Sequence, residues 1–101
     1  MTLVVTLRVR RERLEDFRAF ERHAAAVMAD HGGCLERTVV APVEGRADLF
    51  AEVHVVTFPG EAAFAAYRAD PRLGALAHLR DGAVVSTEIL VGEDGPSYSP
   101  R

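Results

Sequence analysis

A glutamate and a histidine two positions apart, Glu52 and His54, are the residues best suited to chemistry in this chain. They lie in a run rich in β-branched residues, 48–58, which predicts a strand. Alternate side chains of a strand project from the same face, so we expect the carboxylate and the imidazole to lie side by side. A histidine beside a carboxylate can act as a general base with a tuned pKa. The pair therefore predicts a site for proton transfer.

An arginine on another predicted strand could join this pair. Residues 3–10 alternate between two faces, which predicts the first strand, with Arg8 on its more polar face. If 3–10 and 48–58 are neighbours in a sheet, the guanidinium of Arg8 could hold an anionic substrate or an oxyanion beside Glu52 and His54. The same groups could instead form an ion-pair cluster that fixes the strand register and does no chemistry.

The segment 58–76 supplies further candidates for a binding site. It begins with Phe-Pro-Gly and continues through an alanine-rich helical run in which Phe64 and Tyr67 are three positions apart. These two aromatic residues share one face of a helix, either as core residues or as one wall of a pocket. His31 ends the apolar stripe of an earlier predicted helix, and it is either a pocket residue or a partner for the helix C-terminus.

The residue types that the chain lacks exclude several chemistries. It has no Lys, Asn, Gln or Trp and a single cysteine, Cys34. Schiff-base chemistry on lysine and carboxamide oxyanion donors are therefore excluded, as is an internal disulfide. We expect Cys34 to be a small buried residue of a strand. Because no His-x-His, Cys-x-x-Cys or helical histidine pair is present, we expect no metal site and no cofactor.

Length and charge narrow the class of protein. A chain of 101 residues with 49% hydrophobic content fits one compact domain. Its formal charge of -3 argues against a nucleic-acid partner, which requires a concentrated basic surface. The sequence has no long apolar run and no signal-peptide pattern, so we expect no membrane partner and a cytoplasmic location.

The order of the periodic segments predicts the architecture β-α-β-β-α-β. A helix is expected at 11–31, with Gly32-Gly33 as its stop, and a second helical region begins near Pro59. Pro71 should divide this second region, with Asp70 as the N-cap of its second part. The strands are expected at 3–10, 34–41, 48–58 and 83–91. We assign 1–92 to the domain and 93–101 to a flexible tail.

This order is that of the ferredoxin-like α+β fold with a four-stranded antiparallel sheet. Right-handed crossovers would place the first and third strands at the centre as parallel neighbours, with the helices on one face. A second copy of the chain could cover the other face, and we therefore expect a homodimer. The residues expected on that uncovered face are Val4, Phe50, Val56, Phe58, Val84 and Leu90.

Two motifs carry a resemblance to a known group of proteins. They are His31-Gly32-Gly33 after the first helix and the stretch Phe58-Pro59-Gly60-Glu61-Ala62-Ala63-Phe64-Ala65-Ala66-Tyr67, followed by Asp70-Pro71. Over roughly residues 3–91 the chain resembles the dimeric α+β-barrel superfamily. Within it, the sequence is most similar to an uncharacterised bacterial family related to antibiotic-biosynthesis monooxygenases and stress-responsive barrel proteins.

The resemblance implies a small-molecule pocket between sheet and helices, and a cofactor-independent monooxygenase or isomerase acting on an aromatic or lactone-like metabolite. The chain lacks the Asn and Trp that haem-degrading and quinone-forming members use. A non-catalytic ligand-binding module and a structural dimer are the alternatives. The resemblance places His54 inside the pocket, whereas the alternation of strand 48–58 favours Val53 and Val55 facing the helices and His54 at the dimer seam.

Overall fold

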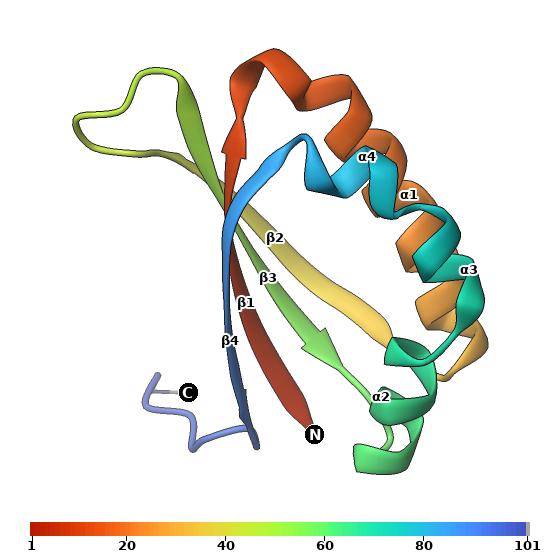
Figure 1. Cartoon of the computed structure of the whole chain (residues 1–101). Coiled ribbons are helices and arrows are strands. Elements are labelled where there is room, and N and C mark those ends of the chain that lie inside the picture. The colour runs from red at the N-terminus through yellow and green to blue at the C-terminus, as the bar shows by residue number, and fades with distance from the viewer. Residues whose placement is uncertain (101) are drawn as a thin grey trace.

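The computed structural model describes residues 1–100 and confirms the ferredoxin-like α+β fold (Figure 1). The second predicted helical region consists of three short helices. In chain order the elements are β1 (Thr2–Arg10), the single 3-10 turn η1 (Arg11–Arg13), α1 (Leu14–Asp30), β2 (Cys34–Pro42), β3 (Leu49–Thr57), α2 (Glu61–Arg68), α3 (Pro71–Ala75), α4 (Ala77–Asp81) and β4 (Val84–Gly92).

The four strands form one sheet in the order β2-β3-β1-β4. The first and third strands are central, as predicted, but the expectation that they run parallel is wrong, because β1 pairs with β3 in antiparallel orientation. The crossover through α1 makes β2 parallel to β1, yet β3 lies between them. Since β2 and β3 are antiparallel neighbours, β3 must run opposite to β1.

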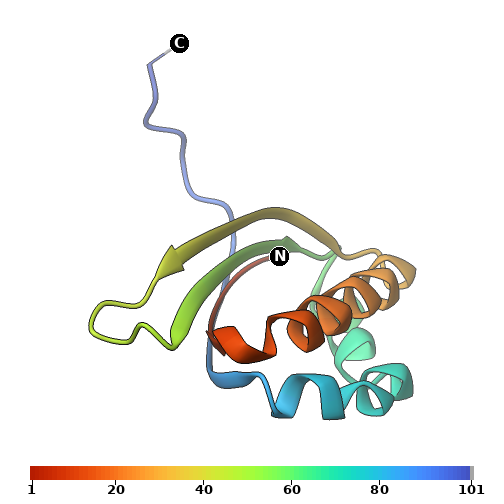
Figure 2. The ribbon, with the colours of Figure 1, turned by 90° about the horizontal axis from the view of Figure 1, so that it is seen from above.

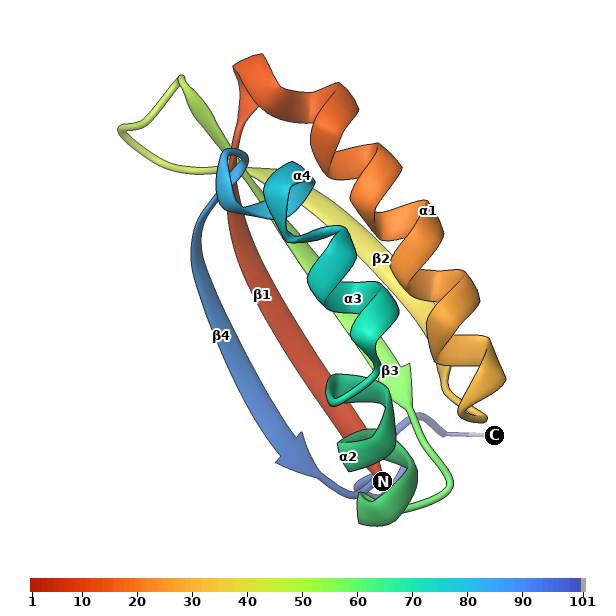
Figure 3. The same cartoon turned by 45° about the vertical axis from the view of Figure 1, so that its right-hand side comes forward.

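All the helices cover the same face of the sheet. Figure 2 shows the curved sheet on one side of the helices, and Figure 3 shows α1 running beside the line of α2, α3 and α4. The β2–β3 hairpin extends beyond the end of the sheet (Figure 1). The opposite face of the sheet carries no element of the described chain.

The register of β1 with β3 decides which residues meet the helices. Leu7 pairs with Glu52 and Val5 with His54, and paired residues share a face. Leu7 belongs to the core beneath the helices. Glu52 and His54 therefore face the helices, and the alternation argument that placed Val53 and Val55 there is wrong.

The same register corrects the residues expected on the uncovered face. Val4 and Leu90, which pair with each other, do lie there together with Val53 and Val55. Three other residues of that set are buried in the core under the helices, namely Phe50, Val56 and Phe58, and Val84 packs against the same core. The uncovered face therefore carries Val53 and Val55 in place of the expected phenylalanines.

The stop after α1 uses the two glycines as predicted. Gly32 has a φ of 75°, its N–H donates to the carbonyl of Ala29, and the N–H of Gly33 donates to the carbonyl of Met28. A Cβ on Gly33 would lie 2.6 Å from the ring of Phe58. This close approach holds the end of α1 against the end of β3.

The proline-divided helix is confirmed. Pro71 begins α3, and the Asp70 side chain accepts a hydrogen bond of 2.9 Å from the N–H of Arg72, which makes Asp70 the N-cap. The break lets α2 sit over the end of β3 while α3 and α4 return along α1 (Figure 3).

Three further expectations concern the ends and the surface. Cys34 is exposed, so the prediction of a buried cysteine is wrong; it is the first residue of the outer strand β2. Residues 93–100 contain no helix or strand, and Arg101 lies outside the described residues. Within residues 1–100, no helix combines the length and the apolar character needed to cross a membrane.

Candidate active site

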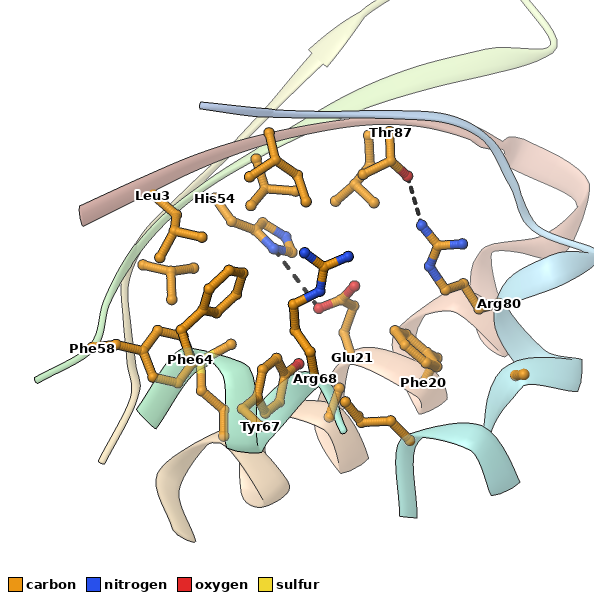
Figure 4. Close-up of a pocket in the computed structure, with 18 of the residues that line it drawn as sticks. Leu3, Phe20, Glu21, His54, Phe58, Phe64, Tyr67, Arg68, Arg80 and Thr87 are labelled. Carbon is orange, nitrogen blue, oxygen red and sulfur yellow. Dashed lines mark hydrogen bonds and ion pairs between the residues drawn. The ribbon is translucent and has the colours of Figure 1, made fainter. Parts of the chain in front are cut away.

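A cavity of about 380 Å³ lies between the sheet and the helices. This volume is in the range of small-molecule sites, roughly 300–1,000 Å³. Its walls are mostly apolar, and Figure 4 shows Phe58, Phe64 and Tyr67 gathered at one end with Arg80 and Thr87 at the other. Thr87 and Ile89 of the edge strand β4 line the cavity yet remain exposed, so the cavity is open beside β4.

Glu52 and His54 lie side by side beneath the helices. Nε2 of His54 is 2.7 Å from Oε2 of Glu52, and both side chains are buried, with exposed fractions of 7% and 2%. His54 lines the cavity, whereas Glu52 lies behind it. The expected pairing of carboxylate and imidazole is confirmed in position.

Arg18 of α1 supplies the charge that balances Glu52. Its guanidinium donates a hydrogen bond to Oε1 of Glu52 and lies over the rings of Phe17 and Phe50. A buried carboxylate is stable only when it is paired and hydrogen-bonded, and Arg18 and His54 together occupy both oxygens of Glu52. Both oxygens of Glu52 therefore have a hydrogen-bond partner.

The other ring nitrogen of His54 faces a second carboxylate. Nδ1 lies 3.8 Å from Oε2 of Glu21 on α1, which also lines the cavity (Figure 4). Burial raises the pKa of Glu21, and the charge of Glu52 raises it further, while His54 lowers it. His54 therefore lies between Glu52, which is paired with Arg18, and a carboxyl group whose pKa is raised.

Glu21 was not predicted as a site residue, although the sequence contains an indication of its role. Glu21 occupies a position of the apolar stripe of α1, between Phe17 and Ala24, both of which are buried. A charged residue on the buried face of an otherwise amphipathic helix indicates a polar partner inside the fold. Arg18 carried no such signal, because only the packing of α1 on β3 brings it to Glu52.

Phe64 and Tyr67, the expected binding residues on α2, both line the cavity. Their rings pack on Phe58 at centroid distances of 5.3 and 5.4 Å. Burial raises the pKa of Tyr67 to about 12, and the charge of Glu21 contributes in the same direction. The phenol is thus a neutral hydrogen-bonding group at neutral pH.

Arg8, the third expected catalytic residue, lies elsewhere. It pairs with Ala51 in the sheet, so it projects from the uncovered face, where its guanidinium is 3.6 Å from Glu88. The expectation that Arg8 lies beside Glu52 and His54 is wrong, because the β1–β3 register puts its side chain on the opposite face.

His31 lies behind the cavity wall and is not among the residues that line it. Its Nε2 is 2.9 Å from Oδ2 of Asp70, which joins the end of α1 to the junction of α2 and α3. Hydrogen bonds from Arg72, and then from His31, hold the pKa of Asp70 well below its usual range. His31 contacts the ring of Tyr67 edge-on, so it supports a cavity residue from outside.

Two arginines that the sequence did not single out line the cavity. Arg68 of α2 lies with its guanidinium carbon 5.5 Å from the centre of the Phe64 ring. Arg80 of α4 donates a hydrogen bond of 2.6 Å to the hydroxyl of Thr87 (Figure 4).

Within residues 1–100, no group of three or more His, Cys, Asp or Glu side chains has an arrangement suited to a metal ion.

The fold is shared with several solved structures. The chain is similar to the cofactor-independent oxygenase SnoaB of Streptomyces nogalater, with 14% identity over 93% of this chain and 94% of that one, at a TM-score of 0.61. It is similar to an antibiotic biosynthesis monooxygenase, with 14% identity, 95% and 100% coverage and a TM-score of 0.63. A protein from Agrobacterium tumefaciens gives 18% identity, 98% and 96% coverage and a TM-score of 0.69.

These likenesses establish the fold alone. The expected resemblance to antibiotic-biosynthesis monooxygenase-like proteins is confirmed at that level. No protein-family model and no curated protein matches the sequence. The structural likenesses assign no function to this chain, because one fold can carry unrelated functions.

The environment of Tyr67 can be tested by titration. The chain has two tyrosines and no tryptophan. In a Tyr98→Phe variant, the ultraviolet signal of phenol ionisation reports Tyr67 alone, and its midpoint should lie at about 12, above the ordinary value of 10.0. Adding Glu21→Gln should lower the midpoint, because a negative charge is removed. A midpoint near 10.0, with circular dichroism unchanged, contradicts the buried placement of Tyr67.

Proposed function

We propose that the cavity is the active site of an acid–base enzyme that removes a proton from a small aromatic or lactone-like substrate. His54 accepts the proton and exchanges it with Glu21, while Glu52 positions His54. Phe64 and Tyr67 hold the apolar body of the substrate. The proposal needs no metal and no organic cofactor.

The observation that carries the proposal is the position of His54 between two unlike carboxylates. In this proposal the pair with Arg18 keeps Glu52 ionised, so that Glu52 accepts from Nε2–H of His54 and Nδ1 is directed at Glu21 and the cavity. An imidazole with one nitrogen held by a carboxylate and the other facing a second carboxyl group at the cavity is suited to act as a general base.

The chemistry after proton removal distinguishes two reactions. A monooxygenase of this kind converts a CH₂ group and O₂ into a carbonyl group and water, with the substrate supplying the electrons. An isomerase returns the proton to a different carbon. The fold likeness to a cofactor-independent oxygenase favours the first reaction. Both require the same base.

The apolar lining of the cavity favours a second candidate, a non-catalytic ligand-binding module. Such a module would bind the same apolar compounds without turnover. The ion pair of Arg18 with Glu52 would then serve only to stabilise the buried polar groups.

A screen of small phenols, naphthols and unsaturated lactones separates the two candidates. Oxygen uptake and, in D₂O, exchange of carbon-bound hydrogen followed by NMR should reveal turnover or its proton-transfer step. His54→Gln should lower the rate at least about 100-fold, as expected for loss of a general base. The matched variant His78→Gln, at an exposed histidine of α4, should leave it unchanged.

Two results contradict the catalytic proposal. One is a His54→Gln variant that turns over a substrate of the wild type at the same rate. The other is a compound that binds in the cavity with neither oxygen uptake nor hydrogen exchange across the whole set, which supports the binding module instead.

We also propose that the chain forms a homodimer through the uncovered face of its sheet. Val4, Val53 and Val55 lie on this face, and Leu90 beside them is 72% exposed. Covering such a surface with a second copy removes apolar area from water. The charged pair of Arg8 and Glu88 on the same face could fix the register of the two copies.

Sedimentation tests the dimer directly. The wild type should be a dimer at micromolar concentration, with an interface of at least about 1,200 Å². Val55→Arg should give a folded monomer, because it places an unpaired cation in that interface. Val40→Arg, at an exposed valine whose pairing with Glu52 puts it on the opposite face, should remain dimeric. A monomeric wild type contradicts the proposal.

A further inference from the structure

We propose that the cavity selects a ligand with an apolar body and a carboxylate group, and that Arg68 and Arg80 bind the carboxylate. The inference names the ligand class of the proposed active site and rests on the proposed function in that respect. The evidence is that, within the described residues, both guanidinium groups keep N–H donors free for a ligand and the cavity lining carries more positive than negative charge.

Both arginines are positioned by neutral groups. The Phe64 ring holds the guanidinium of Arg68 through its face, an interaction that uses none of its N–H donors. The hydroxyl of Thr87 accepts one hydrogen bond from Nη2 of Arg80. Most donors of both groups are left for a ligand, because an arginine offers five N–H groups in a planar fork.

Neither arginine is in direct contact with a carboxylate of the described chain, although burial raises the pKa of Glu21 and the charge of Arg80 acts on Glu21 to lower it. Within residues 1–100, Arg68 and Arg80 form no ion pair, whereas Arg18 behind the cavity is paired with Glu52. Glu21 is the one carboxylate among the cavity-lining residues of the described chain, and it faces His54. The lining therefore carries more positive than negative charge, although the whole chain has a formal charge of -3.

The residues proposed to bind the carboxylate and those proposed to transfer the proton come from different elements. Arg68 comes from α2 and Arg80 from α4, while Glu21 comes from α1 and His54 from β3. Arg80 and Thr87 lie at the end of the cavity away from Phe58, and the side chain of Arg68 reaches from the Phe64 side toward them (Figure 4). A guanidinium fork matches the two oxygens of a carboxylate, so a ligand anchored there would extend its apolar body toward Phe58 and Tyr67, past His54.

Paired probes test the inference. The anion 2-naphthoate and its neutral analogue 2-naphthamide have the same planar body, and their own fluorescence is measured against a chain that has no tryptophan. The wild type should bind naphthoate at least about tenfold more tightly than the amide, since a hydrogen bond to a charged group contributes that much. Arg68→Gln and Arg80→Gln should each weaken naphthoate binding by about tenfold and leave amide binding unchanged.

Arg22→Gln provides the matched control, because Arg22 is exposed on α1 and lies outside the cavity lining. It should bind both probes as the wild type does. Equal affinity for the two probes, no binding of either, or equal loss of both in the Arg68 and Arg80 variants overturns the inference. These results leave the acid–base role of His54 intact, since that role is measured by turnover in the His54→Gln variant. Loss of that role would likewise leave the preference for naphthoate unchanged.

Discussion

The burial of Glu52 and His54 between the sheet and the helices is the constraint on which the rest of the site depends. A carboxylate in such a position must be paired, and two neighbours meet this requirement, Arg18 from α1 and Nε2 of His54. Among the described residues no buried side-chain nitrogen or oxygen lacks a hydrogen-bond partner. The pairing also fixes the orientation of His54, so the interaction that satisfies the buried carboxylate also orients the residue proposed as the base.

The divided helical region shapes the cavity beside this pair. A continuous helix after Pro59 would run in one direction over the sheet, whereas the break at Pro71 lets α2 place Phe64 and Tyr67 near Phe58. The chain then returns through α4, which brings Arg80 to the opposite end of the cavity (Figure 4). The segment is therefore both scaffold and cavity wall. Asp70, the N-cap of α3, is also the residue that His31 binds.

The elements and their order followed from sequence because each depends on local physics. The alternation of strands, the stop at Gly32 and the break at Pro71 are set by backbone conformation. The sequence did not determine which face of β3 meets the helices, because both of its faces carry apolar residues. Phe50 and Val56 occupy one face and Val53 and Val55 the other, so alternation could not decide which face meets the helices.

The sequence likewise predicted the part of the candidate site that depends on local geometry. Glu52 and His54 were adjacent by strand geometry, and Phe64 and Tyr67 shared a helix face. Arg18 and Glu21 of α1 contact Glu52 and His54 from outside β3. Only tertiary packing brings them together. Of these two residues of α1, only Glu21 is indicated by the sequence, because it places a charge on the buried stripe of the helix. Arg8 was misplaced because the register of β1 with β3, which local sequence does not determine, pairs it with Ala51.

The tautomer of His54 tests the central claim most directly. Two-dimensional NMR of the imidazole nitrogens, with the His54 signals assigned by their loss in the His54→Gln variant, reports which nitrogen carries the proton. The account predicts that Nε2 is protonated and hydrogen-bonded to Glu52, which leaves Nδ1 as the nitrogen that exchanges protons with Glu21. A ring protonated on Nδ1 alone would place the lone pair of Nε2 against the carboxylate of Glu52 and would contradict the account.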